Sequence, residues 1–266
     1  MIGALVARVV LVALLGFMTV PTVVVILASF NPTAILSFPP AGLSLRWYVN
    51  ALTYPQFQRA ALNSLVVTLA SAVLAVPFGT AAALALVRHP LRARGLWTSL
   101  LLSPLVIPGV AAGLGLLILA AKLGLLQTRW VLVVAHVALV LPFVVRSVAV
   151  SVANLDPALE RAAASLGAPP WRVFVRVTLP LLRPGLFAGL LFAVIVSINE
   201  FVVSLFVSTR VTEILPVAMF TYVVNYTDPT MAALSTLFIV ATVVAVVLAD
   251  RFLDLSRVFQ IGEEGR

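Results

Sequence analysis

The chain has 266 residues, of which 62% are hydrophobic and only 10% charged, and its mean hydropathy is +1.18. A soluble domain carries about 25% charged residues, so the composition excludes a soluble globular protein and predicts an all-α membrane protein embedded in a lipid bilayer. The absence of cysteine excludes disulfides, thiolate metal sites and thiol catalysis. The net charge of +8 comes from basic residues scattered between apolar runs, so we expect no nucleic-acid partner.

Six apolar stretches are long enough to cross a bilayer, whose core needs about 20 residues of helix. They predict transmembrane helices at residues 9–30, 62–87, 96–121, 130–151, 185–207 and 231–249. The alternative for the first stretch is a signal peptide, but its apolar run is longer than a secretory core and no clear cleavage site follows it. We therefore expect residues 1–266 to form one six-helix transmembrane domain.

The basic residues predict the orientation of these spans. With the N-terminus in the cytoplasm, 12 of the 17 Lys and Arg residues fall in cytoplasmic segments. Cytoplasmic loops are enriched in Lys and Arg. The asymmetry therefore predicts that both termini are cytoplasmic.

The long cytoplasmic loop, residues 152–184, carries helix signals. Asp156 and Pro157 are typical of a helix start, and Gly167 followed by two prolines is typical of a helix end. One face of this helix is expected to carry four small or apolar side chains at helical spacing: Leu159, Ala162, Ala163 and Leu166. The segment is either an amphipathic loop resting on the bilayer surface or a docking element for a cytosolic partner.

The same loop resembles the EAA motif of ABC importer permeases. The motif residues are Glu160, Arg161, Ala162, Ala163 and Gly167, followed after nine residues by Val177-Thr-Leu179-Pro180. One departure is that Arg161 occupies the usual position of the motif's glutamate, with Glu160 as the nearest acid. The resemblance implies a type I importer permease bundle of the MetI-like class.

Further segments are similar to the spermidine/putrescine branch of these permeases, in particular to its second permease subunit. They include Ser44-Leu-Arg-Trp-Tyr48, Pro104-Leu-Val-Ile-Pro108, Asn199-Glu-Phe201 and Ala232-Ala-Leu-Ser-Thr236. Permeases for iron, phosphonate and opines are related, so these solutes remain alternatives to a polyamine.

The family resemblance implies a set of partners. They are a second permease subunit, two copies of a cytosolic ATP-binding subunit and a periplasmic solute-binding protein, all at a bacterial inner membrane. It also implies no catalytic residue, no metal and no cofactor in this chain, because the partner subunit binds and hydrolyses the ATP. Residues 152–184 would be the coupling loop to that subunit.

Polar residues inside the predicted spans are candidates for the translocation path. Ionisable side chains within a membrane are functional by default, so Glu200 and the adjacent Asn199 are expected at the path or at the interface with the partner permease. A structural hydrogen-bonding role is the alternative for Glu200. His136 is interpreted as a packing and hydrogen-bonding residue, and Ser103, Pro104 and Pro108 predict a kink in the third span.

Three other classes of membrane protein compete with an importer permease. A secondary transporter usually shows internal repeats and ion-coupling residues within the membrane, and this chain shows neither pattern. An intramembrane enzyme needs a motif such as His-Glu-x-x-His or Gly-x-Ser-x-Gly, and neither occurs. A simple channel leaves the docking loop without a purpose.

Overall fold

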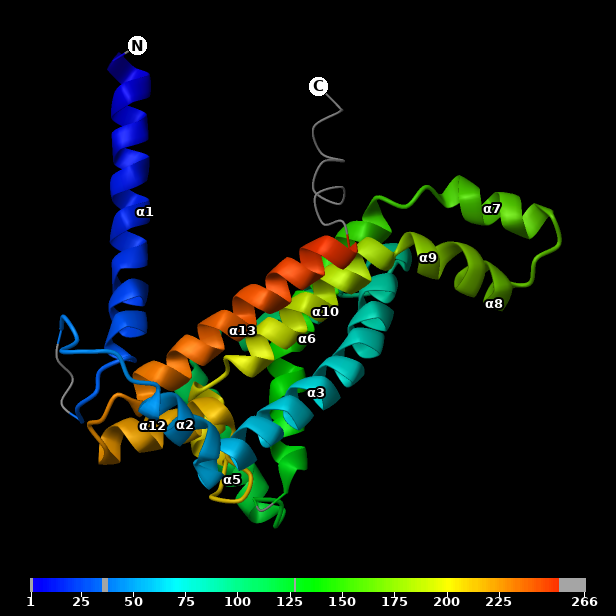
Figure 1. The fold of residues 1–266 in the computed structure, drawn as a ribbon. Coiled ribbons are helices and arrows are strands. Elements are labelled where there is room, and N and C mark those ends of the chain that lie inside the picture. Colours follow the sequence, from blue (N-terminus) through cyan, green and yellow to red (C-terminus); the bar gives the residue numbers. More distant parts are fainter. Residues whose placement is uncertain (1, 35–37, 127, 254–266) are drawn as a thin grey trace. The chain divides into compact units, whose positions relative to one another are not determined.

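The computed structural model describes residues 2–34, 38–126 and 128–253, and within these ranges the regular structure is entirely helical (Figure 1). In chain order the helices are α1 (Ile2–Ala28), α2 (Arg46–Thr53), α3 (Pro55–Arg88), α4 (Arg94–Leu102), η1 (Ser103–Leu105), α5 (Gly109–Lys122), α6 (Arg129–Ala153), α7 (Pro157–Ser165), α8 (Pro170–Val173), η2 (Phe174–Thr178), α9 (Leu179–Leu181), α10 (Arg183–Ile198), α11 (Val202–Val207), α12 (Leu215–Asn225) and α13 (Thr230–Leu253). They divide into two compact units, residues 59–217 and the remainder, which are described separately.

Every predicted span corresponds to helical structure. Among the described residues, α1, α3 and α6 are single helices long and apolar enough to cross a membrane. Two bent pairs raise the number to five if each pair is one span: Arg94–Leu105 with α5, and Pro170–Leu181 with α10. The part of α13 whose side chains are described, Thr230–Val244, is a shorter apolar helix. The all-α membrane fold is confirmed, and the number of apolar helices among the described residues is roughly consistent with the expected six spans.

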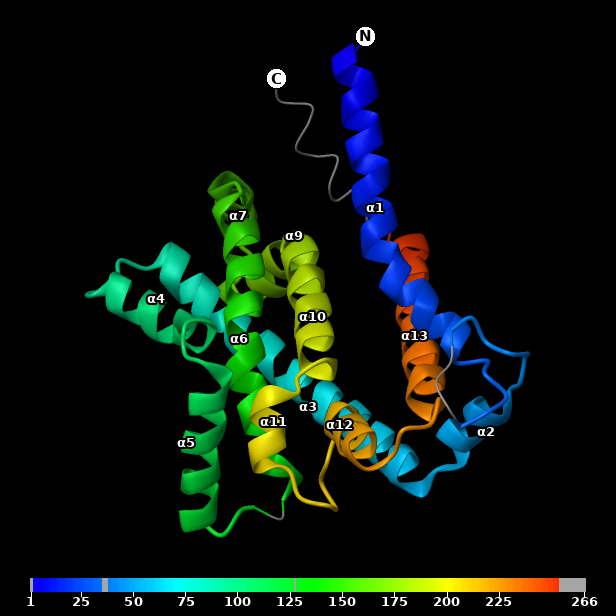
Figure 2. The ribbon, with the colours of Figure 1, turned by 90° about the vertical axis from the view of Figure 1, so that its left-hand side faces the viewer.

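The third span is sharply bent. The segment Arg94–Leu105, which ends in the 3₁₀ turn η1, meets α5 at 95°, and Pro108 lies directly before α5 (Figure 2). Proline lacks the amide proton that would continue the helical hydrogen bonds. The kink predicted from Ser103, Pro104 and Pro108 is therefore confirmed, and it turns the chain through nearly a right angle.

The fifth span is broken rather than continuous. Helix α10 ends at Ile198 and α11 begins at Val202, so the prediction of one uninterrupted helix over residues 185–207 is wrong at residues 199–201. The sequence carries no proline or glycine at this point. The contacts at the break come from Glu200, which lies within it, and from His136 on α6, and the hydropathy pattern reveals neither.

Within the unit of residues 59–217, close contact between α6 and α10 forms the centre of the core. Val140, Val144 and Val148 on α6 are completely buried. Gly185 and Gly189 on α10 face the same helix, and a Cβ atom added at Gly185 would lie 2.3 Å from Ser151 Oγ. Small residues allow helix backbones to approach closely, and the resulting van der Waals packing stabilises helix association in lipid.

The other unit joins both ends of the chain. Indole Nε1 of the buried Trp47 donates to the carbonyl of Asn31 at 2.6 Å, and Asn50 Nδ2 donates to Thr230 Oγ1 at 2.8 Å. α2 packs against α13, and α1 packs against α13 with one end while most of its side chains stay exposed. None of the most apolar window of α1 is buried, as expected for a helix surrounded by lipid.

Candidate functional site

The helix predicted in residues 152–184 is present as α7. The Asp156 side chain accepts a hydrogen bond from the amide of Ala158 at 2.8 Å, and Pro157 is the first helical residue. At the other end the amide of Gly167 donates to the carbonyl of Ala164, the amide of Ala168 donates to that of Ala163, and Gly167 has φ of +82°. This pair of bonds is a Schellman motif, so both predicted ends are confirmed within a residue or two.

The chain then returns as a second arm. It consists of α8, the π-helical turn η2 and α9, and Pro170 is the first residue of α8. α7 lies beside α8 and η2, so the two arms form a hairpin, the one that carries the α7 and α8 labels in Figure 1. We call residues 156–181 the coupling hairpin. The motif residues Leu179 and Pro180 lie half-buried at the base of its second arm.

Glu160 holds the two arms together. Its Oε1 atom accepts a hydrogen bond from the guanidinium of Arg88 at 2.9 Å, an ion pair that ties α7 to the end of α3. The same oxygen accepts the hydroxyl of Thr178, which is buried in the π-helical turn. Charge-assisted hydrogen bonds of this kind are stronger than neutral ones. Glu160 therefore fixes the hairpin with respect to its own bundle.

The tip of the coupling hairpin is exposed. Leu166 is 90% exposed and Trp171 is 62% exposed. Arg161, Ala162 and Gly167 are exposed as well, whereas Ala163 is half-buried. Leu159 and Leu166 therefore lie on the open side of α7, while Glu160 and Ala163 lie toward the second arm. Exposed apolar side chains of this size are typical of an interaction surface.

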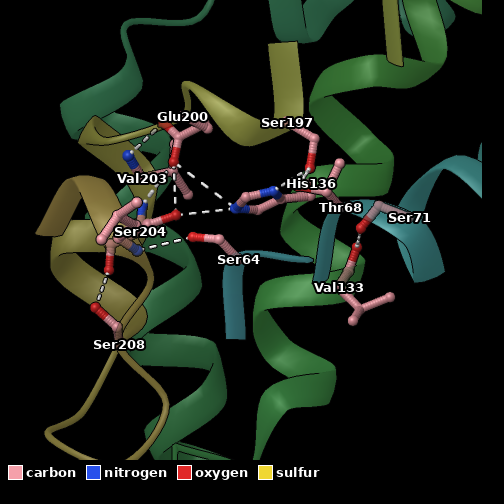
Figure 3. Close-up of polar contacts among 11 residues, drawn as sticks. Ser64, Thr68, Ser71, Val133, His136, Ser197, Glu200, Val203, Ser204 and Ser208 are labelled. Atoms are coloured by element: carbon pink, nitrogen blue, oxygen red, sulfur yellow. Dashed lines mark hydrogen bonds and ion pairs between the residues drawn. The ribbon is translucent and has the colours of Figure 1, made fainter. Parts of the chain in front are cut away.

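A second group of polar residues surrounds the break in the fifth span (Figure 3). Glu200 accepts hydrogen bonds from the amide of Val203 and from both the amide and the hydroxyl of Ser204, at 2.7–2.9 Å. These amides are the first donors of α11, which have no partner inside the helix. Because both carboxylate oxygens accept bonds from α11, Glu200 stabilises the start of that helix.

His136 connects this group to the core. Its Nδ1 lies 2.7 Å from Ser197 Oγ and its Nε2 lies 2.9 Å from Ser204 Oγ, and only 1% of the residue is exposed. Ser197 in turn donates to Thr68 on α3 at 3.1 Å. Both ring nitrogens of His136 thus have a hydroxyl partner, as the predicted hydrogen-bonding role requires. We call Thr68, His136, Ser197, Glu200 and Ser204 the polar cluster.

The two predicted path residues differ in their surroundings. The Glu200 side chain is 11% exposed, and its Oε2 lies 3.9 Å from Nε2 of His136. Asn199 is exposed, and its side-chain amide donates to the carbonyl of Ile195 at 2.8 Å. Within the described ranges no three His, Asp or Glu side chains gather as a metal site.

Several residues that complete these sites were missed by the sequence analysis. Arg88 is one of the basic residues counted only for the orientation of the spans, and Thr178 lies between Val177 and Leu179 of the motif. Ser197 and Ser204 carry no motif of their own. One signal was available for them, because polar residues inside an apolar span need partners in lipid, and Ser197, Glu200 and Ser204 are spaced by three and four residues.

Comparisons with known proteins agree on one family. Residues 75–256 match the family described as binding-protein-dependent transport system inner membrane component. The spermidine/putrescine transport system permease protein PotC of Escherichia coli (strain K12) is 29% identical over 250 residues, which cover 94% of each chain. The putrescine transport system permease protein PotI of the same strain is 33% identical over 240 residues, covering 86% of this chain and 85% of PotI.

A solved structure shows the same fold. It is a crystal structure of a bacterial ABC transporter involved in the import of the acidic polysaccharide alginate, and its matching chain superimposes with a TM-score of 0.72 at 17% identity over 95% of both chains. The predicted family resemblance is thus confirmed. The chain is a multi-pass protein of the binding-protein-dependent transport system inner membrane component family, a permease subunit of an ABC importer rather than an enzyme.

Proposed function

We propose that the whole chain acts as one permease domain that forms a path for a polyamine, such as spermidine or putrescine, together with a second permease subunit. The observation that supports this substrate is the similarity to PotC and PotI over most of their length. The fold alone does not select a solute, because the alginate importer shares it. Related small solutes such as iron, phosphonates and opines are the alternatives.

We also propose that the coupling hairpin docks on a cytosolic ATP-binding subunit, with one copy for each permease. The exposed tip at Leu166 and the anchored base at Glu160 support this role, because docking requires an accessible surface on a rigid support. ATP is bound in that partner and no cofactor is needed in this chain. A periplasmic solute-binding protein delivers the solute to the opposite side.

Reconstitution tests the substrate. The permease pair, the ATP-binding subunit and the binding protein of the same transport system are assembled in lipid vesicles, and uptake of labelled spermidine and putrescine is followed with and without ATP. We expect ATP-dependent uptake of at least one polyamine, reduced by an excess of the other. Uptake of ferric iron or a phosphonate without polyamine uptake would instead assign one of the alternative solutes.

The orientation of the chain follows from its basic residues. Reporter fusions placed in residues 89–95 and in the coupling hairpin are expected to be cytoplasmic, and a fusion in residues 208–230 is expected to be periplasmic, because 12 of 17 basic residues then face the cytoplasm. Both termini would be cytoplasmic. A periplasmic C-terminus contradicts this topology.

Glu200→Gln separates the two proposed roles of Glu200. An amide side chain can accept from one of the two α11 amides, but its NH₂ group is repelled by the other, so the structural role predicts reduced assembly with the partner permease and loss of transport. If Glu200 instead contacts a cationic solute along the path with Asn199, the complex should assemble normally while polyamine uptake falls. Pull-down of the partner permease and uptake are measured on the same preparation.

Uptake at the wild-type level would rule out both roles. The matched control is Asn199→Ala, which removes an exposed amide and leaves the cap of α11 intact. Under the structural interpretation this variant assembles normally, whereas under the path interpretation its uptake is also impaired.

A further inference from the structure

We propose that the coupling hairpin presents a cationic surface, centred on Arg161 and Arg172, to an acidic docking surface on its ATP-binding partner. The proposal rests on the docking role given above and adds the chemistry of the contact. It assigns the carboxylate of Glu160 to an internal bond within this chain. The usual polarity of the motif, an acidic residue at the position of Arg161, is thereby reversed.

The acidic side chains of the hairpin are engaged by the chain itself. Asp156 accepts the amide of Ala158 at the start of α7. Glu160 is bonded to Arg88 at 2.9 Å and to the hydroxyl of the buried Thr178, which leaves its side chain 21% exposed. Both bonds end on Oε1, so the charge of Glu160 is already paired with Arg88 inside the chain.

The basic side chains of the hairpin point outward instead. Arg161, Arg172 and Arg176 are all exposed, and the ion pairs found among the described residues involve none of them. The guanidinium of Arg172 lies over the ring of Trp171 at 5.4 Å from its centroid, so an aromatic face supports this charge. Arginine next to an exposed aromatic ring is a combination enriched in protein interfaces.

The exposed apolar tip lies between these charges in the sequence. Leu166 follows Arg161 by five residues and precedes Arg172 by six. A partner surface that fits this arrangement has an apolar centre for Leu166 and carboxylates around it. Oppositely charged rims of this kind set orientation and association rate more than affinity. The complementary partner is therefore a protein groove with Asp and Glu at its edge.

A charge exchange inside the chain tests the internal bond. Glu160→Arg and Arg88→Glu are each expected to abolish ATP-dependent uptake, because each places like charges at the base of the hairpin. The double variant restores the pair with reversed polarity, and we expect it to recover at least half of the uptake. If Glu160 pairs with the partner subunit instead, the double variant stays inactive, which overturns the proposal.

Binding of the ATP-binding subunit tests the outward charges. The permease pair is placed in nanodiscs of neutral phosphatidylcholine, and the dissociation constant for the ATP-binding subunit is measured between about 50 and 500 mM salt. Over this range the electrostatic screening length becomes shorter than the width of the contact surface. Arg161→Glu is expected to weaken binding about tenfold or more at low salt and to flatten the salt dependence. Arg92→Glu, an exposed charge in residues 89–93, is the matched control and should bind like the wild type.

The remaining outcomes separate this proposal from the docking role. If Leu166→Asp abolishes binding while Arg161→Glu binds like the wild type, docking stands and the cationic contact is refuted. If neither variant affects binding, the docking role itself is wrong. An effect of Arg161→Glu that appears only in nanodiscs containing anionic phosphatidylglycerol would assign the arginines to lipid headgroups and would equally refute an acidic protein partner.

Discussion

Replacing Gly185 with valine is expected to prevent stable folding of the permease. A Cβ atom at this position would lie 2.8 Å from the carbonyl oxygen of Ser147 and 2.3 Å from Ser151 Oγ, so the backbones of α6 and α10 have to separate. Overpacking of a tight core costs about 3 kcal/mol or more where backbone has to move. We expect much less protein in the membrane and a lower melting temperature in detergent, measured by immunoblot and tryptophan fluorescence.

Gly115→Val is the matched control for this variant. Gly115 also lies inside a helix, α5, but a Cβ atom added there meets nothing within 4 Å. The control should accumulate and melt like the wild type. Equal behaviour of the two valine variants would show that the contact between α6 and α10 is not the limiting part of the fold.

Replacing Gly167 with valine is expected to abolish transport without removing the protein from the membrane. Gly167 has φ of +82° at the end of α7, a conformation that costs a branched residue about 1–2 kcal/mol or more. The helix end and the tip carrying Leu166 would then change position. ATP hydrolysis in the reconstituted transporter should continue at its basal rate and no longer respond to the loaded binding protein.

Gly167→Asn distinguishes backbone geometry from surface chemistry. Asparagine adopts positive φ far more readily than valine does, and space is available because an added Cβ meets nothing within 4 Å. We expect the asparagine variant to retain most of the transport activity. Normal uptake by Gly167→Val would contradict the requirement for the left-handed turn.

The parts of the fold that depend on local chemistry could be predicted from the sequence. Long apolar runs gave the positions of α1, α3 and α6, and the boundaries of α7 followed from Asp156, Pro157 and Gly167. These features depend on side chains close to one another in the chain. The bend of the third span was predicted for the same reason, because proline acts on its own backbone.

The break at residues 199–201 could not be predicted in this way. It depends on Glu200, whose bonds to α11 are local, and on His136, which bonds Ser197 and Ser204 from 61 and 68 residues earlier in the chain. Hydropathy identifies an apolar stretch but not whether its hydrogen bonds are continuous. Helix α12 was missed because residues 208–230 were treated as a connection between the last two spans.

The candidate sites show the same division. The motif identified Glu160 and Gly167, and the helix start and stop signals placed Glu160 inside α7 and Gly167 at its end. The partners of Glu160 lie on α3 and in the π-helical turn, 72 and 18 residues away, so the sequence did not show that its charge is already neutralised within the chain. The sequence showed that Arg161 departs from the motif. The consequence of this departure depends on the partners of Glu160, which are Arg88 and Thr178.

The polar cluster also limits how the permease can change shape during transport. Thr68, His136, Ser197 and Ser204 join α3, α6, α10 and α11 through hydrogen bonds shielded from water, where a broken bond has no solvent molecule to replace the lost partner. Sliding of one of these helices past another would break several such bonds at once. We therefore expect these four helices to move as a single rigid block between the inward-open and outward-open states, so that each turnover is a reorientation of the block rather than a rearrangement within it.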